Sequence, residues 1–208
     1  RQAAAQLSGL RDATVLISTL ETVYEDVPSD LAPAAGAVHA WLIQNRGDTY
    51  AAADREKQVF TQICQDLHIA DVRVDEWPID ECSWTDLSEG MRQIYSQGRE
   101  EYDQCCWRPT VEALHNWRKR VKYLWHQVLL LTPIWPRPMK VIADELDELG
   151  GLLGLDHDCA ELAHVVSKQI PEQMLPADAR DELMRVIYTR RRRLQERGRH
   201  LGCQLYAE

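Results

Sequence analysis

Apolar residues recur at three- and four-residue spacings along most of the chain, as expected for helices that each bury one face. Strand-like alternation occurs only in one short run, residues 72–77. Proline and glycine interrupt the helical pattern at several points. The pattern therefore predicts an all-α protein with helices over residues 2–24, 31–45, 47–69, 84–106, 110–132, 138–153, 158–170 and 178–206.

The predicted helix boundaries rest on helix-breaking residues, glycine and proline, and on residues that cap the start of a helix. Glycine alone marks the breaks at Gly47 and at Gly150-Gly151, whereas proline marks the breaks at residues 28, 78, 109, 133–138, 171 and 176. Ser83 and Asp178 are typical helix starts, because a small oxygen-bearing side chain accepts hydrogen bonds from free backbone amides. These residues predict where the chain turns between helices.

A weak internal repeat relates two distant segments. Leu7-Ser-Gly-Leu-Arg-Asp12 is followed by Leu16, and Leu153-Gly-Leu-Asp-His-Asp158 by Leu162. The simplest interpretation is two helix boundaries, at each of which an Asp caps the next helix. The repeat gains meaning only if the flanking segments also correspond.

Length and composition describe a folded protein with a substantial core. The chain has 208 residues, of which 45% are hydrophobic, and 24 Lys and Arg against 33 Asp and Glu, a formal net charge of −9. This length suits one domain or two small coupled halves, and the composition excludes a disordered chain. At first sight the acidity argues against polyanionic partners.

Charge is, however, unevenly distributed. Residues 66–103 hold eleven acids and three arginines, a net charge of −8. Residues 114–131 hold two lysines and two arginines without an acid, and residues 185–199 hold seven arginines and one glutamate. Two basic helices are therefore predicted within an acidic protein.

Two further features bear on the compartment. The six cysteines show no CxxC pair, so neither a zinc ribbon nor a disulfide framework is indicated, and we interpret them as reduced thiols. No apolar run approaches the roughly 20 residues of a membrane-spanning helix. We therefore expect a cytoplasmic protein without a membrane partner.

The helix predicted over residues 110–132 has two distinct faces. On an ideal helical wheel its apolar residues cluster between about 260° and 340°, and a group of basic residues falls between about 40° and 140°. The predicted core stripe is Trp117, Val121, Leu124, Val128 and Leu131. The predicted basic face is His115, Arg118, Lys119, Lys122 and His126. A solvated basic surface is the ordinary alternative to a binding face.

The last predicted helix is also basic. Leu183, Ile187, Leu194, Leu201 and Leu205 mark its packing side. Arg190 and Arg197 fall on the same seam at heptad spacing, with Arg193 beside them, whereas Arg191 and Arg192 are expected to face water. If the two basic helices are neighbours, their cations converge on a channel that an extended anion would neutralise.

In these motifs the sequence resembles the CHAD family, the conserved histidine α-helical domain. The resemblance covers most of the chain. It is carried by Leu114-His-Asn-Trp-Arg-Lys-Arg-Val-Lys-Tyr-Leu-Trp, by Leu146-x-x-Leu-x-x-x-Leu-Gly-x-x-x-Asp158 and by the echo at Leu7. Tyr95-x-x-x-Arg99 and the closing Arg-rich helix, with Leu201-Gly-Cys-Gln-Leu-Tyr, are also similar to it.

The resemblance implies two pseudo-symmetric helical-bundle halves of antiparallel helices around a basic central cavity that binds inorganic polyphosphate, without catalysis or a cofactor. The halves would span residues 1–107 and 108–208. His115 lies 43 residues before Asp158, so the equivalent helix for Asp12 would precede residue 1. Association with polyphosphate granules is a further hypothesis.

The resemblance also implies a set of site residues. By motif position the ligand-facing residues are His115, Arg118, Lys119 and Lys122, with Arg99 flanking them and Asp12 and Asp158 orienting the cations. The helical wheel adds Arg190, Arg193 and Arg197. His126 stands where the family usually has an aromatic residue, so binding and packing both stay open for it.

Two alternative functions compete with polyphosphate binding. His157, Glu161 and His164 lie at i, i+4 and i+7, a spacing that can hold a divalent metal in a phosphohydrolase. Polar surface residues of a helix are the more ordinary interpretation of that trio. The basic helices are also compatible with nucleic acid, although the acidic segment 66–103 would repel a bulky duplex.

Overall fold

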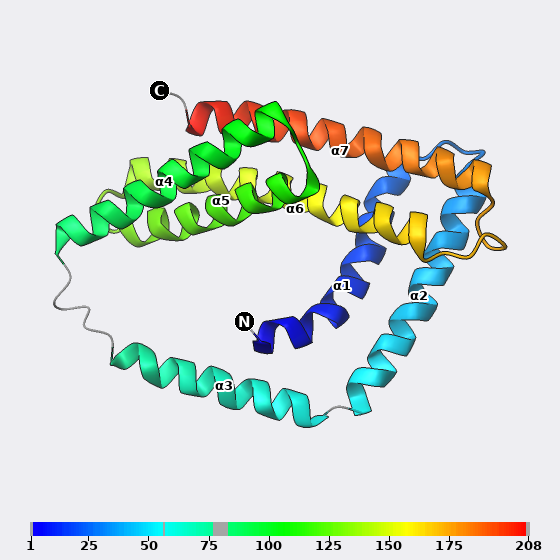
Figure 1. Ribbon diagram of the computed structural model, residues 1–208, viewed down its shortest axis with the longest axis horizontal. Coiled ribbons are helices and arrows are strands. Elements are labelled where there is room, and N and C mark those ends of the chain that lie inside the picture. The colour runs from blue at the N-terminus through cyan, green and yellow to red at the C-terminus, as the bar shows by residue number, and fades with distance from the viewer. Residues whose placement is uncertain (1, 56, 77–82, 207–208) are drawn as a thin grey trace. The chain divides into compact units, whose positions relative to one another are not determined.

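A computed structural model describes residues 2–55, 57–76 and 83–206 of the chain, with the backbone alone given for 2–12, 48–55, 57–60 and 62 (Figure 1). Within these ranges the regular structure consists of seven α-helices and one 3-10 turn, without a strand. The all-α prediction is therefore confirmed. The elements are α1 Gln2–Val23, η1 Tyr24–Asp26, α2 Ala32–Arg55, α3 Lys57–Asp75, α4 Trp84–Trp107, α5 Val111–Leu131, α6 Pro136–Lys168 and α7 Ala177–Leu205.

The chain forms two compact units. Unit 1 comprises residues 1–82 and 161–187, and unit 2 comprises residues 83–160 and 188–208, so α6 and α7 each contribute a part to both. These units are defined by spatial proximity, whereas the predicted halves 1–107 and 108–208 describe a repeat in sequence. α4 belongs to unit 2, and the division into repeat halves stays a prediction.

In unit 1, α1 packs against α2. Leu20 and Val23 of α1 and Val38 of α2 are fully buried, and the C-terminal part of α6 and the start of α7 supply further buried aliphatic residues. Arg180 donates hydrogen bonds from Nη2 to the carbonyl oxygens of Ile170 and Leu175, at 2.9 and 3.1 Å. These bonds stabilise the turn between α6 and α7.

In unit 2, α4 packs against α5, and both helices begin at clear caps. Ser83 accepts a hydrogen bond from the backbone amide of Asp86, whose carboxylate accepts one from the amide of Ser83. This capping box confirms the predicted helix start at Ser83. Thr110 caps α5 by accepting from the amide of Ala113 at 3.1 Å.

Two predicted helix breaks are wrong, and both rested on glycine alone. α2 continues through Gly47, and α6 runs unbroken through Gly150 and Gly151. Asp158 is therefore a mid-helix residue of α6 rather than a cap, and residue 12 likewise lies within α1. A helical glycine costs roughly 1 kcal/mol relative to alanine, which tertiary packing offsets. Gly150 is such a case, because it is buried against Val121 of α5.

Three further predictions concern the end of α3, the start of α7 and the break at Pro78. The strand-like residues 72–75 form the end of α3, so helical packing overrides their β-branched character. α7 begins at Ala177, which places Asp178 in its first turn instead of at the cap. The predicted break at Pro78 lies outside the described residues.

Along α7 the buried positions keep a heptad spacing but on a different seam from the predicted one. The buried positions within the helix are Leu183, Ile187, Arg191, Leu194, Gly198, Leu201 and Gly202. From Ile187 to Leu201 the spacing alternates between four and three residues, so Arg191 and Gly198, instead of Arg190 and Arg197, accompany Ile187, Leu194 and Leu201. The predicted seam is therefore wrong at Arg191, which is buried, and at Arg197, which is exposed.

Candidate functional site

The core stripe of α5 anchors the candidate site. Four of the five predicted stripe residues, Trp117, Val121, Leu124 and Val128, are buried, and Leu131 is half-buried. With this face inside, His115 and Arg118 become half-buried, whereas Lys119, Lys122 and His126 remain exposed. The amphipathic pattern of the helix therefore decides which side presents the cations.

α5 and α6 lie antiparallel in unit 2, and three contacts define their register. The rings of His115 and His157 are 5.2 Å apart between centroids. The guanidinium of Arg118 lies beside Gly154, and Val121 lies beside Gly150. Each step along α5 is thus matched by a step in the opposite direction along α6, which brings the two sequence motifs together.

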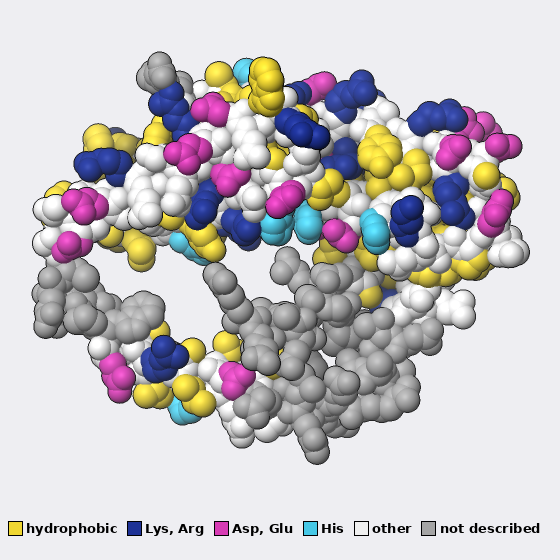
Figure 2. All heavy atoms as spheres, viewed as in Figure 1, with side chains coloured by type: hydrophobic (Ala, Val, Ile, Leu, Met, Phe, Trp, Pro, Cys, Tyr) yellow, Lys and Arg dark blue, Asp and Glu magenta, His cyan; other side chains and the backbone are white. Residues whose placement is uncertain are grey.

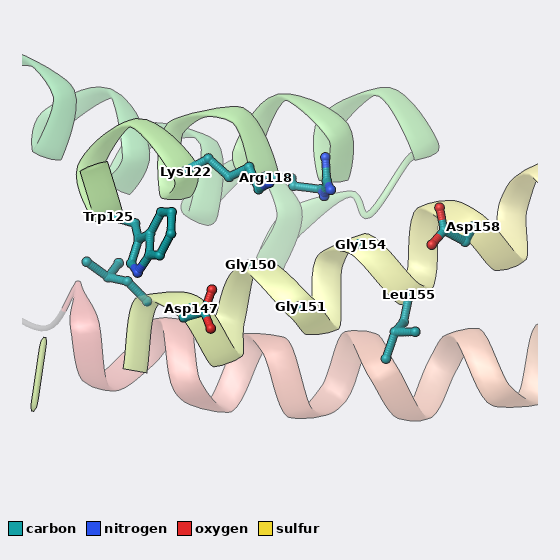
Figure 3. A pocket seen from close by; sticks show the side chains of 10 residues that line it. Arg118, Lys122, Trp125, Asp147, Gly150, Gly151, Gly154, Leu155 and Asp158 are labelled. Atoms are coloured by element: carbon teal, nitrogen blue, oxygen red, sulfur yellow. The ribbon is translucent and has the colours of Figure 1, made fainter. Parts of the chain in front are cut away.

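A groove of about 310 Å³ lies between these two helices (Figure 3). It brings together two of the predicted cations, Arg118 and Lys122, with the predicted acid Asp158. The remaining lining residues are Trp125, Leu146, Asp147, Gly150, Gly151, Gly154 and Leu155. The three glycines form a floor without side chains, so a ligand in the groove would meet the backbone of α6.

The charges of the groove are mixed. Arg118 and Lys122 face it from α5, and Asp147 and Asp158 face it from α6. Figure 2 shows Lys, Arg and His side chains gathered along α5 and α6, with acidic side chains among them. An anion in the groove would therefore be attracted by two cations, and the two carboxylates beside them would limit where the anion can lie.

Arg118 is the most constrained of these cations. Its Nε is buried, and it has no hydrogen-bond partner among the described residues. Within that part of the chain, Arg118, Lys119 and Lys122 also form no ion pair. A partly buried guanidinium has a forked set of donors that suits the oxygens of phosphate.

Of the three contacts that define the register of α5 and α6, that of His115 with His157 lies nearest the N-terminus of α5. His157 is half-buried, and its Nδ1 has no hydrogen-bond partner among the described residues. In the internal repeat, His157 takes the position of Arg11, one residue before the motif acid. His157 therefore brings a titratable side chain close to the predicted ligand residue His115.

The arginines of α7 do not act as one group. Arg190 is half-buried and lies near Cys159. Burial raises the pKa of the Cys159 thiol to about 11, and the guanidinium of Arg190 opposes this shift. Arg193 is exposed. Arg197 is exposed and donates to Glu148 at 3.5 Å, in a second groove of about 380 Å³. None of these three arginines lines the glycine-floored groove.

Arg191 corrects a prediction, because it does not face water. It is 8% exposed and forms an ion pair with Asp156, which is 1% exposed. Gln195 donates a further hydrogen bond to the same carboxylate at 2.8 Å. The buried carboxylate explains why α7 tolerates a guanidinium on its packing side.

The remaining predicted residues lie apart from the groove. Arg99 is half-buried on α4, and Lys119 is exposed on α5. His126 is exposed, with its ring 4.8 Å from that of its neighbour Trp125. The side chain of Asp12 lies outside the described residues.

Besides the aliphatic and glycine positions, the groove contains two residues that the sequence patterns do not predict, Trp125 and Asp147. Trp125 falls at about 20° on the wheel, between the core stripe and the basic face, so its border position was a usable signal. Asp147 had none, because its role follows from the register of α6 against α5. Opposed residues of two helices cannot be paired from helical periodicity alone.

Two findings concern the alternative functions and the membrane. Among the described residues, no group of three or more His, Cys, Asp or Glu has an arrangement that could hold a metal ion, so His157, Glu161 and His164 do not form one. Within the same residues, no helix combines the length and apolar character needed to cross a membrane.

Comparison with known proteins gives one result for the chain. Neither curated proteins nor solved structures yielded a match. The family model of the CHAD domain matches residues 1–167, which include α5 and nearly all of α6, whereas α7 lies beyond the match. Because this match spans most of the 208 residues, the chain belongs to the CHAD domain family.

Proposed function

We propose that this protein binds inorganic polyphosphate through the α5 and α6 groove of unit 2. Membership of the CHAD domain family is consistent with polyphosphate binding in general. The observation that carries the proposal is Arg118, a half-buried cation whose Nε has no hydrogen-bond partner among the described residues. The guanidinium also forms no ion pair among these residues, so an anionic ligand that accepts hydrogen bonds from it gains affinity.

The groove residues have distinct proposed roles. Arg118 offers forked donors to phosphate oxygens, and Lys122 offers a mobile point charge one helical turn farther along α5. Lys119 and His115 extend the basic face beside them. Asp158 orients the cations. The weaker candidates are Arg190, Arg193, Arg197, Arg99 and His126, since none of them lines the groove.

We propose a binding role without catalysis, with attachment to polyphosphate granules as its cellular consequence. A bound polyanion releases counterions when it meets clustered cations, so the affinity should fall steeply with salt. Purified protein should be titrated with fluorescently labelled polyphosphate at two ionic strengths. Salt-insensitive binding, or no binding to the full chain, contradicts the proposal.

Single substitutions locate the site on α5. Arg118→Ala and Lys122→Ala should each weaken binding and reduce the slope of log affinity against log salt by about one, as the loss of a phosphate contact does in nucleic-acid complexes. Arg120→Ala is the matched control, because Arg120 lies on the same helix but off the basic face. Equal losses for all three variants would indicate nonspecific attraction to the protein's surface.

The competing functions are separated by two assays on the same preparation. Release of inorganic phosphate from polyphosphate, with and without added divalent metal, tests for a phosphohydrolase. Competition between labelled polyphosphate and duplex DNA tests for nucleic-acid binding, because phosphate contacts alone do not distinguish the two polyanions. We expect no phosphate release and weak competition by DNA.

A further inference from the structure

The structure assigns Gly154 as a positioning residue that determines where the guanidinium of Arg118 lies in the groove. This inference rests on the proposed polyphosphate function, which it deepens. Gly154 faces Arg118 across the α5 and α6 interface, and both residues line the same groove (Figure 3). Gly154 itself need not contact the anion, since it acts through Arg118.

The distances show how close this approach is. A Cβ atom on Gly154 would lie 3.3 Å from Nε, 3.5 Å from Nη2 and 3.9 Å from Cζ of Arg118. All three atoms belong to the guanidinium, so this group lies against α6 at the edge of the space that a side chain at position 154 would take, and a Cβ there would require Nε to move by a few tenths of an ångström.

The other two glycines of the groove meet different surroundings. A Cβ on Gly150 would make ordinary contact with Val121 at 3.8 Å, and a Cβ on Gly151 would meet nothing within 4 Å. Of the three, Gly154 is the one whose missing side chain makes room for a cation. The matched control is Gly90, a helical glycine of α4 that does not line the groove and whose Cβ would meet nothing within 4 Å.

An alanine at position 154 should separate binding from stability. The tip of an arginine side chain is flexible and can move by a few tenths of an ångström, so the fold should tolerate the methyl group. Alanine also favours the helix relative to glycine. The displaced guanidinium, however, should lose part of a charge-assisted hydrogen bond to phosphate, which corresponds to roughly three- to tenfold weaker binding.

The test is a double-mutant cycle on the full chain with labelled polyphosphate of one length. Gly154→Ala should weaken binding three- to tenfold in the wild-type background and change it less than about 1.5-fold in the Arg118→Ala background, because coupled residues are not additive. Gly90→Ala should bind within about twofold of wild type, because position 90 does not line the groove. The thermal midpoint of Gly154→Ala should equal or exceed that of wild type, since the helix gains an alanine.

Each other outcome overturns the assignment in a recognisable way. If wild type fails to bind polyphosphate, the proposed function and this inference fall together. If wild type binds and Gly154→Ala binds equally well, only the inference fails. An equal loss in both backgrounds shows that Gly154 does not act through Arg118. A loss of binding accompanied by a lower thermal midpoint shows an effect on folding instead.

Discussion

Arg191 holds the buried carboxylate of Asp156 through two hydrogen bonds of 3.0 Å, from Nε to Oδ1 and from Nη2 to Oδ2. This bidentate pair joins α7 to α6 within unit 2. Asp156 lies on the opposite side of α6 from Gly154 and Asp158, since two residues along a helix turn the side chain by about 200°. The groove therefore faces one side of α6 while the other side is attached to α7.

Breaking this pair should strongly destabilise the protein. Asp156→Ala leaves a buried guanidinium without its counter-ion, for which a cost of about 3–5 kcal/mol is expected. Urea unfolding monitored by circular dichroism measures the loss. Glu148→Ala is the control, because it breaks an exposed pair between the same two helices, worth less than about 1 kcal/mol. Similar losses for the two variants would contradict the buried-pair interpretation.

Removing one carboxylate from the groove should strengthen polyphosphate binding. Asp147→Asn deletes a negative charge that faces the proposed ligand, and we expect about a two- to threefold gain, equivalent to Coulomb repulsion at roughly 8 Å in water. Titration with labelled polyphosphate at low salt measures the effect. Asp144→Asn is the control, because Asp144 is an exposed acid of the same helix that pairs with Lys140. An unchanged affinity for Asp147→Asn argues against a ligand in this groove.

Two buried glycines of α7 should respond oppositely to alanine. A Cβ on Gly202 would lie 2.6 Å from the buried ring of Trp117 and 2.8 Å from Tyr102, so Gly202→Ala should cost about 1–3 kcal/mol through overpacking. A Cβ on Gly198 would meet Leu149 and Leu153 at an ordinary 3.8 Å. Gly198→Ala should be neutral or stabilising by up to about 1 kcal/mol. Thermal unfolding of both variants tests the contrast.

Cysteine reactivity should divide by burial. Burial raises the pKa of Cys105 to about 12 and that of Cys159 to about 11, with the Glu101 carboxylate adding to the shift at Cys105. Since the thiolate is the nucleophile, both should resist iodoacetamide at pH 8. Cys64, Cys106 and Cys203 are exposed and should be alkylated first, as peptide mass spectrometry will show. Early modification of Cys159 would contradict its burial.

The same two thiols should weaken the protein at alkaline pH. Their folded-state pKa values lie above the ordinary value of 9.0, so the unfolded chain loses these protons first. Their contribution to stability is complete below about pH 9 and is lost as pH rises through 11 and 12. Between pH 8 and pH 10.5, the urea midpoint of unfolding should decrease more for wild type than for the double variant Cys105→Ala/Cys159→Ala. An identical fall would show that other groups, such as the buried Tyr206, dominate.

The parts of the fold that were predictable depend on local chemistry. The start of α4 followed from Ser83, because a side-chain cap acts over three residues. The faces of α5 followed from periodicity, which correctly separated the buried Trp117 from the exposed Lys122. For the same reason Arg118 and Lys122 were recognised as one face, and they line one groove.

The parts that were not predictable depend on what a helix packs against. The low helix propensity of Gly150 and Gly151 predicts a break, yet α6 continues through both, and both line the groove between α5 and α6. The helical wheel places Arg191 off the packing seam and so predicts that it faces water, whereas the partner that holds it inside, Asp156, is 35 residues away in sequence.

By itself, the sequence determined the helical class, several helix ends, the basic face of α5 and the CHAD resemblance, because these depend on residue type, spacing within about two turns and recognisable motifs. Only the tertiary structure decided that α6 is continuous, that Gly154 lies beneath Arg118 and that Arg191 is buried on Asp156. Those outcomes depend on the register between helices. Register is set by the packing of residues far apart in the chain, which no local pattern contains.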